Sequence, residues 1–321
     1  MFEKETIELF KTLRDLSATS NGGWKHSPVE NAKIDYFPAH LNESNLINFR
    51  RTALSGGTIS FPDRPLWYLP QPQSIASFKP WPKGIPFWQK VRGIRDILMQ
   101  MYRVNKQCKI KMNGLTDNLV GNPCYYLLGH RKVTDFCIRM FYYHEKLKQE
   151  FSADSIETIM EIGGGFGGLC EKLISSKEFA IKTYILIDLP ENLSLSYYYL
   201  SNSGLKVKVA VKEKDLDSIN ITETEKVVIL LAPWLLPKLS RKVDLFINTM
   251  SFQHMTLDNL KYYLSEIDRL KVRKLYLVNR EGKRDPSDVV MSKYPISSAY
   301  ELVKKEAYPL SNHETRIYSL R

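Results

Sequence analysis

A cluster of glycines in the second half of the chain is the feature whose residue types point most directly to chemistry. The run from Ile159 to Gly168 reads Ile-Met-Glu-Ile-Gly-Gly-Gly-Phe-Gly-Gly. It predicts a strand, a tight turn and a helix, because glycines let the backbone turn sharply and approach a ligand closely, with the helix N-terminus behind them. Two kinds of adenosine cofactor use such a turn.

A carboxylate decides between the two cofactors. Gly163, Gly165 and Gly168 satisfy the dinucleotide spacing, whereas Gly163, Gly165 and Gly167 behind Glu161 match the nucleotide loop of methyltransferases that use S-adenosylmethionine (SAM). Glu161 beside the turn would repel a pyrophosphate, but it would attract the α-ammonium and the sulfonium of SAM. The sequence therefore predicts SAM as the cofactor, bound by Glu161 and the three glycines of the second pattern.

An acid after the next predicted strand supports an adenosyl ligand. Asp188 ends the run Tyr-Ile-Leu-Ile-Asp that begins at Tyr184. A carboxylate at this position accepts hydrogen bonds from both ribose hydroxyls of an adenosyl cofactor. We therefore assign Asp188 and the following Leu189 to the cofactor site, together with Asn248 at the end of a later strand.

Methyl transfer to a hydroxyl also needs an aligned acceptor and a base. Ligands of open α/β sheets gather at the carboxyl ends of the strands, and the predicted strand Val243–Asn248 brings three polar residues to that edge: Ser251, Gln253 and His254. His254, whose unperturbed pKa is ~6.5, is predicted to be the general base. Ser251 and Gln253 are predicted to bind the substrate.

The polar loop Asn113–Asn122 provides a second candidate base and further acceptor contacts. Asp117 is the alternative base, and Asn122 is expected to contact a hydroxyl-rich acceptor. Arginines hold phosphates and carboxylates well. Three arginines are therefore candidates for gripping an anionic acceptor: Arg50, Arg51 and Arg131.

A metal-assisted reaction would need two or three carboxylates near the carboxyl edge of the sheet. Asp244 begins its predicted strand and so lies at the opposite edge. No acid follows Asn248 until Asp258. We therefore expect a metal-free reaction and assign no metal ligands.

The elements that position these residues alternate from Phe151 onward. The predicted strands are Thr158–Ile162, Thr183–Ile187, Lys206–Val211, Lys226–Leu231, Val243–Asn248 and Lys274–Val278, and the predicted helices are Gly168–Ser175, Glu191–Ser201 and Thr256–Leu270. Tyr300–Ala307 and Thr315–Leu320 are expected to close the sheet as an antiparallel pair. This pattern predicts an α/β fold with a Rossmann-like, doubly wound sheet over residues 151–321.

Residues 1–150 lack this alternation and are predicted to form a mainly helical and irregular region that caps the sheet and binds the acceptor. Helices are expected at Met1–Ser17, Ile94–Tyr102 and Thr134–Leu147. The segment Phe61–Trp88 holds 7 of the 16 prolines and many aromatic residues. It is therefore predicted to be an extended, irregular segment packed on the body of the protein.

Charge and composition narrow the classes of partner. Between Lys79 and Gln149 there are 14 lysines and arginines but only 4 acidic residues, so this segment carries nearly all of the net charge of +11. Such a segment suits nucleic acid, an anionic substrate or an anionic membrane surface. No apolar run is long enough to span a membrane, the N-terminus lacks a secretory signal, and the four cysteines show no paired spacing. A cytoplasmic protein, or one peripheral to the inner membrane face, is expected.

Several motifs together resemble a known family, the sugar O-methyltransferases among the class I SAM-dependent methyltransferases. They are the run Glu161–Gly168, the run Ile-Asp-Leu-Pro-Glu-Asn from Ile187, the run Asp-Leu-Phe-Ile-Asn-Thr-Met-Ser from Asp244, and the upstream Asn48-Phe-Arg and Gly121-Asn-Pro. The resemblance covers most of the chain between Asn48 and Asn279, and departs from the family at His254, where the family has Glu. It implies the class I fold, SAM as cofactor and a sugar or glycan acceptor, such as a surface polysaccharide or a nucleotide-linked or lipid-linked sugar.

Two other functions stay open at this point. The basic segment 79–149 also suits a nucleic-acid methyltransferase, although the Asp/Asn-Pro-Pro-Tyr/Phe run of amino-base methyltransferases is replaced here by Asn-Thr-Met-Ser from Asn248. A non-catalytic binding module is the third reading, and the intact Glu161 and Asp188 argue against it.

Overall fold

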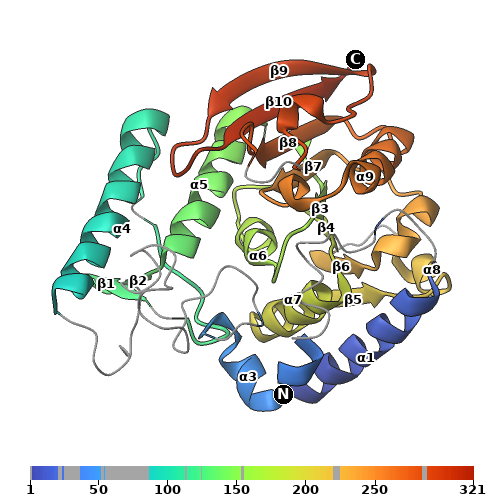
Figure 1. The fold of residues 1–321 in the computed structure, drawn as a ribbon, viewed down its shortest axis with the longest axis horizontal. Helices are drawn as coiled ribbons and strands as arrows, with labels where there is room; N and C mark the ends of the chain where they lie inside the picture. Colours follow the sequence, from blue (N-terminus) through green and yellow to red (C-terminus); the bar gives the residue numbers. More distant parts are fainter. Residues whose placement is uncertain are drawn as a thin grey trace.

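The computed structural model describes most of the chain. The described residues are 2–20, 24, 37–51, 54, 87–112, 114–123, 125–152, 155–219, 225–283 and 288–321, with only the backbone of residues 87–92. Figure 1 shows a central sheet, with helices packed around it and the chain's last two strands at one edge.

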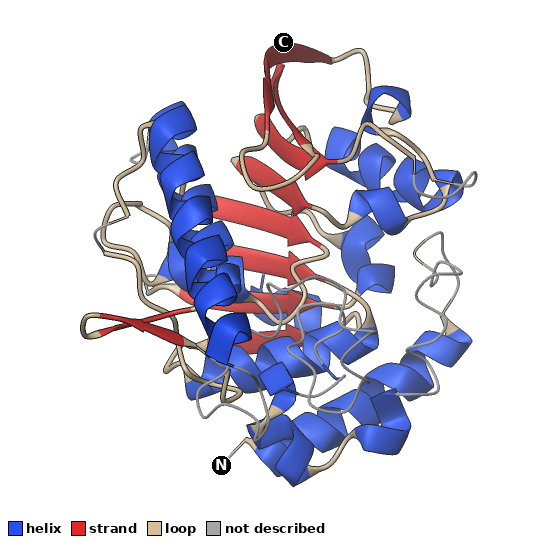
Figure 2. Cartoon of the chain, turned by 60° about the vertical axis from the view of Figure 1, so that its left-hand side comes forward, coloured by secondary structure: helices blue, strands red, loops and turns tan. Residues whose placement is uncertain are grey.

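Eight strands form the sheet, in the order β5-β6-β4-β3-β7-β8-β10-β9. Neighbouring strands pair in parallel except at β10, which is antiparallel to both β8 and β9. The strands are β3 (Thr158–Ile162), β4 (Thr183–Ile187), β5 (Val207–Ala210), β6 (Val227–Leu231), β7 (Leu245–Thr249), β8 (Lys274–Asn279), β9 (Tyr300–Ala307) and β10 (Glu314–Leu320). Every residue of β3, β4 and β6 is buried, which explains why these strands are mostly runs of apolar residues. Figure 2 shows these central strands side by side between the helices.

The sheet changes its direction of winding at β3. This strand pairs with β4, which follows it in the chain, and on its other side with β7, which comes much later. The carboxyl ends of β3 and β7 therefore lie next to each other at a topological switch point, where open α/β sheets bind their ligands.

The alternation predicted for residues 151–321 is confirmed, and each predicted strand and helix forms within two residues of its predicted ends. The helical segments there are α6 (Gly168–Ile174), α7 (Pro190–Asn202), α8 (Asp215–Ile219), η5 (Pro233–Lys238), η6 (Phe252–His254), α9 (Leu257–Arg269) and η7 (Met291–Lys293). The final antiparallel pair is also confirmed as β9 and β10.

The first 150 residues contain more regular structure than the sequence predicts. Their elements include α1 (Glu3–Thr19), α3 (Glu43–Ile47), η1 (Phe49–Arg51), α4 (Phe87–Cys108), the strands β1 (Tyr126–Leu128) and β2 (Arg131–Val133), and α5 (Asp135–Glu150). The β1–β2 hairpin was not predicted. Most of the proline-rich segment lies outside the described residues, but its last two residues, Phe87 and Trp88, are helical and begin α4.

Helices from this first region pack directly on the sheet domain. Helix α1 lies along α7 (Figure 1), and Tyr197 of α7 donates a hydrogen bond of 2.8 Å to Glu5 of α1. Helix α5 packs on α6, and its Lys146 forms a 2.7 Å ion pair with Glu306 of β9. A division of the chain at residue 150 stays a prediction, because α5 precedes that boundary and yet contacts α6 and β9 beyond it. Among the described residues, no helix has both the length and the apolar character needed to cross a membrane.

Candidate cofactor and active site

The glycine turn follows β3 and faces an open space. Gly163, Gly165 and Gly167 have φ angles of +78°, +61° and +89°, a region that side chains with a Cβ rarely adopt. A Cβ on Gly163 would lie 1.9 Å from Oγ of Ser251, whereas one on Gly165 would meet no described heavy atom within 4 Å. The turn is therefore closely packed at Gly163 and open at Gly165, as a ligand-binding turn requires.

A cavity of about 160 Å³ lies against this turn. Four parts of the chain line it: the turn with Glu161 and Gly163 to Phe166, the start of α6, the end of β7 with the residue after it, and helix α5. The lining residues are Glu161, Gly163, Gly164, Gly165, Phe166, Leu169, Thr249, Met250, Phe136, Arg139, Met140 and Tyr143. The contribution of α5 could not be read from the sequence, because only the folded chain brings this helix to the switch point.

The carboxyl group of Glu161 is buried in the wall of this cavity. Its Oε2 accepts a hydrogen bond of 2.8 Å from the hydroxyl of Tyr184 on β4. The pKa of Glu161 is raised to about 8, chiefly by burial. The hydrogen bond from Tyr184 acts against this rise, and the nearby Asp188 carboxylate adds to it. No described lysine, arginine or histidine forms an ion pair with this carboxyl group. A cationic ligand would stabilise its charged form.

Asp188 holds the glycine turn in place. Its Oδ2 accepts a 2.7 Å hydrogen bond from the backbone N–H of Gly165, and its Oδ1 accepts from the backbone of Leu189 and from the side chain of Asn192. Each carboxylate oxygen can accept more than one hydrogen bond, so contact with ribose hydroxyls remains compatible with this arrangement. The cofactor contacts predicted for Asp188 and Leu189 stay predictions.

Asn248 and Gln253 brace the carboxyl edge from within. The fully buried Asn248 amide donates to the carbonyl of Ile162 at 2.8 Å and accepts from Asn279 at 2.9 Å, which ties β7 to β3 and β8. Gln253, also buried, accepts a 3.1 Å hydrogen bond from the backbone of Arg280. Both side chains support neighbouring strands, and the ligand contacts predicted for them stay predictions.

Met250 is a strained residue that the sequence did not reveal. It has a φ of +61°, and its backbone N–H donates to the carbonyl of Val278 at 2.7 Å. A non-glycine residue in this region costs of order 1–3 kcal/mol and persists only where its surroundings hold it. Met250 lines the cavity, so the strain lies at the site itself.

His254 ends the short helix η6 on the same edge of the sheet. It is half-buried, and its Nε2 lies 3.3 Å from Nε2 of Gln253. His254 does not line the cavity at the glycine turn. After β7, the last lining residue among those described is Met250. Ser251 lies between them and packs against Gly163. The roles of His254 as base and of Ser251 as a substrate contact stay predictions.

Asp117, the second candidate base from the sequence, is held in a buried ion pair. Arg50 reaches both of its carboxylate oxygens, at 2.7 and 3.3 Å, and the hydroxyl of Thr134 donates to Oδ2 at 2.5 Å. The side chains of Arg50 and Asp117 are 5% and 4% exposed. Both oxygens of the carboxylate are therefore engaged within the chain, and the role of Asp117 as an alternative base stays a prediction. The same ion pair occupies Arg50, which was expected to grip the acceptor.

The two upstream motifs form a brace behind the glycine turn. Arg50 donates its backbone N–H to the carbonyl of Gly121 at 3.0 Å, and Asn122 donates to Asn48 at 2.7 Å. A Cβ on Gly121 would come within 2.2 Å of the ring of Phe49. That ring packs on Phe166 of the glycine turn, with centroids 5.2 Å apart. These motifs thus support the turn.

Asn122 and Arg131 lie outside the cavity lining. Asn122 is exposed, with a φ of +51°, and its carbonyl accepts a hydrogen bond from Arg51 at 2.5 Å. Arg131 on β2 donates to the carbonyl of Met112 at 2.8 Å. Their proposed contacts with an acceptor stay predictions.

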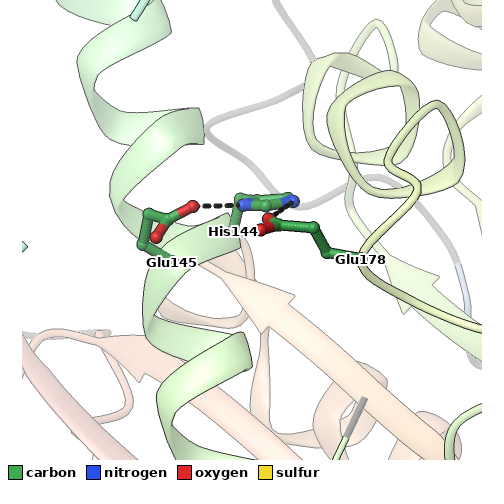
Figure 3. A group of neighbouring side chains, drawn as sticks. All are labelled: His144, Glu145 and Glu178. Atoms are coloured by element: carbon green, nitrogen blue, oxygen red, sulfur yellow. Dashed lines mark hydrogen bonds and ion pairs between the residues drawn. The ribbon is translucent and has the colours of Figure 1, made fainter. Parts of the chain in front are cut away.

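One group of metal-type ligands occurs among the described residues, at His144, Glu145 and Glu178. Figure 3 shows the imidazole of His144 between the two carboxylates. Its Nδ1 lies 2.8 Å from Glu145, and its Nε2 lies 3.0 Å from Ser176 and 3.7 Å from Glu178. The two carboxylates lie nearer to different ring nitrogens, so each of the two nitrogens already has a polar partner within the chain. The group joins α5 to the loop after α6, at the end of α6 away from the glycine turn.

Comparison with known proteins identifies no family for this chain. No family model and no curated protein matches the sequence. Solved structures with a similar fold include magnesium protoporphyrin IX methyltransferase from Synechocystis PCC 6803 with bound SAM, which is 10% identical over 70% of this chain and 97% of its own, with a TM-score of 0.38. An rRNA methylase from Escherichia coli is 11% identical over 57% of this chain and 66% of its own, with a TM-score of 0.35.

A third solved structure concerns the conversion of a disulfide bond into a thioacetal group during echinomycin biosynthesis. It is 11% identical over 56% of this chain and 81% of its own, with a TM-score of 0.40. Similarities this weak carry no argument about activity. The predicted α/β fold with a Rossmann-like, doubly wound sheet is confirmed by the order and the mostly parallel pairing of the eight strands.

Proposed function

We propose that this protein is a SAM-dependent O-methyltransferase. The observation that carries the proposal is the buried carboxyl group of Glu161, which lines the cavity at the glycine turn and has no cationic partner among the described side chains. The α-ammonium of SAM would compensate this buried charge, whereas the pyrophosphate of a dinucleotide would be repelled by it.

Arg139 on α5 supplies the opposite charge in the same cavity. Its side chain is 26% exposed and 3.7 Å from Asp135. Its guanidinium lies over the ring of Phe136, 5.6 Å from the centroid, which is a cation–π distance. The amino-acid end of SAM carries both an ammonium and a carboxylate. We therefore assign Glu161 to the ammonium, Arg139 to the carboxylate and Asp188 to the ribose hydroxyls.

Bound SAM would supply a methyl group activated by its sulfonium. The chain's own residues must then align the acceptor hydroxyl and remove its proton. His254 is the proposed base, because it lies at the carboxyl edge of the sheet, four residues after Met250 of the cavity wall. Gln253 beside it is held by the backbone of Arg280, which fixes the start of this segment.

The proposed acceptor is a hydroxyl of a sugar or glycan. The support is the resemblance of the runs at Glu161, Ile187 and Asp244 to the sugar O-methyltransferases, because all three runs meet at the carboxyl edge around the switch point. The upstream motifs add support of another kind, since they brace the glycine turn through Phe49 and Phe166.

RNA is a second candidate acceptor, favoured by the basic segment. Its described lysines and arginines include the exposed Arg103, Lys106, Lys109 and Lys111. A protein that tracks phosphates loses affinity steeply as salt rises, with a slope set by the number of phosphate contacts. A salt titration of RNA binding therefore separates this candidate from a sugar methyltransferase.

Calorimetric titration with S-adenosylhomocysteine (SAH) and with NAD tests the cofactor. We expect heat from SAH and none from NAD, and binding of NAD alone would overturn the proposal. The base is tested with methyl-labelled SAM and a panel of sugar acceptors. His254→Ala should lower kcat by ~10²–10⁴-fold with SAH affinity unchanged, and His130→Ala, in the exposed β1–β2 turn, serves as the control. Wild-type turnover in the His254 variant would remove His254 from the mechanism.

A further inference from the structure

Helix α4 presents large apolar side chains to solvent. Ile94, Leu98, Met99 and Tyr102 are 39%, 49%, 44% and 55% exposed. The opposite side of the helix is buried through Ile97 and Val104 and packs toward α5. In Figure 1 α4 is the outermost helix on its side of the molecule, with α5 between it and the sheet. We call the side formed by residues 94, 95, 98, 99, 102, 103 and 106 the outer face of α4.

Apolar and cationic residues share this outer face. Residues four apart lie above one another on a helix, so Ile94, Leu98, Tyr102 and Lys106 form one row and Arg95, Met99 and Arg103 form the next. Arg103 and Lys106 are exposed, and the side chain of Arg95 is 66% exposed. Lys106 lies over the ring of Tyr102, 5.7 Å from its centroid. Arg95 also contacts the adjacent Asp96 at 3.1 Å.

We propose that the outer face of α4 docks on the surface of an anionic lipid bilayer. Aliphatic side chains enter the region just below the headgroups, tyrosine sits at the headgroup level, and arginine and lysine meet the lipid phosphates. The helix has 22 residues and therefore spans roughly 33 Å, enough to lie along a membrane surface over several lipids.

The composition of the outer face favours lipid over two other occupants. A nucleic-acid phosphate backbone would contact the cations, but it gives exposed Ile94, Leu98 and Met99 nothing apolar to pack on. A second copy related by a twofold axis would bring this basic face against its own like charges, which is unfavourable. Neither objection applies to an anionic bilayer, which offers both an apolar layer and negative charge.

Docking through α4 would hold the cofactor cavity one helix away from the membrane. Helix α5 packs on α4 and also lines the cavity with Phe136, Arg139, Met140 and Tyr143. An acceptor carried on a lipid would then be presented near the site. The docking itself does not rest on the proposed methyltransferase activity, because it is argued from the exposed face alone.

Flotation of the full-length protein with vesicles tests the proposal. Vesicles of phosphatidylcholine alone are compared with vesicles that also contain phosphatidylglycerol. We expect binding to the anionic vesicles only, weakened by salt. Arg95→Gln, Arg103→Gln and Lys106→Gln together should reduce partitioning roughly a hundredfold, and Leu98→Ser with Tyr102→Ser about tenfold. Leu302→Ser with Val303→Ser removes a comparable exposed apolar pair beside lysines on β9 and should change nothing.

Three results would overturn the proposal. One is no partitioning of the wild-type protein to anionic vesicles. The second is that the wild-type protein binds RNA and not vesicles, with RNA binding reduced in the triple cation variant and unchanged in the Leu98/Tyr102 variant. The third is a dimer in sedimentation that dissociates when Leu98 and Tyr102 are changed. SAH titration of the same variants shows that they are folded, and it reports separately on the cofactor site.

Discussion

Glu161 and Asp117 both have buried carboxyl groups, and the two groups differ in their partners. Asp117 forms an ion pair with Arg50 and accepts a hydrogen bond from the hydroxyl of Thr134. Among the described residues, Glu161 accepts one hydrogen bond, from Tyr184, and it faces a cavity. A buried charge that is paired within the chain stabilises one arrangement of the fold. A buried carboxyl group that is left without a cation, beside an open turn, is placed for a ligand.

The largest effect is expected from breaking the closed pair. Asp117→Ala should lower the free energy of unfolding by about 3–5 kcal/mol, because it leaves the Arg50 guanidinium buried and uncompensated. Urea denaturation measures this loss. Arg50→Met combined with Asp117→Leu should recover most of it, since neither charge is then stranded. An unchanged midpoint in Asp117→Ala would mean that the pair does not brace the fold.

Removing the carboxyl group of Glu161 should lower ligand affinity and leave the stability of the fold intact. Glu161→Gln should weaken SAH binding by about 1.5–3 kcal/mol at a pH near 8, through loss of a charge-assisted contact, while stability is kept or increased. Calorimetry and urea denaturation on the same sample separate the two effects. If the variant loses stability and keeps its affinity, Glu161 is a structural residue like Asp117.

The raised pKa of Glu161, about 8 against an ordinary 4.5, gives a pH dependence with a definite sign. The unfolded chain loses this proton near pH 4.5 and the folded chain near pH 8, so the contribution of Glu161 to the free energy of unfolding falls as pH rises between them. Below pH 8, SAH affinity should rise about tenfold per pH unit, with release of one proton on binding. Calorimetry in buffers of different ionisation enthalpy counts that proton. A flat profile, the same as that of Glu161→Gln, would show that the group is already ionised.

Much of this site is predictable from local sequence, and the rest depends on distant partners. Two features are local in sequence: the turn at Gly163 to Gly167 and the buried strand before Asp188. Each is formed by consecutive residues, so the pattern alone predicts its position. The partner of Asp117 lies 67 residues away, and the amide network of Asn248 depends on Asn279 of the next strand. Polar residues of these types look the same in sequence whether they meet a ligand or each other.

The smallest effect on SAH affinity is expected from a change at Arg139. This residue lines the cavity from α5, a contribution that only the folded structure shows. Arg139→Gln should weaken SAH by about 1 kcal/mol, because its guanidinium is partly exposed and solvent screens its charge. The comparison ligand is SAH without its carboxylate, whose affinity should not change. Arg95→Gln, on the outer face of α4, is the matched control. Equal losses for the two ligands would show that Arg139 does not contact the carboxylate.

The most direct test of the central claim compares SAH with its analogue lacking the α-amino group, on wild type and on Glu161→Gln. If the buried carboxylate meets the ammonium, wild type should prefer SAH by about 1.5–3 kcal/mol, and Glu161→Gln should bind the two ligands nearly equally. Equal preference in both proteins would contradict the account and would leave Glu161 as a buried carboxyl group without a ligand.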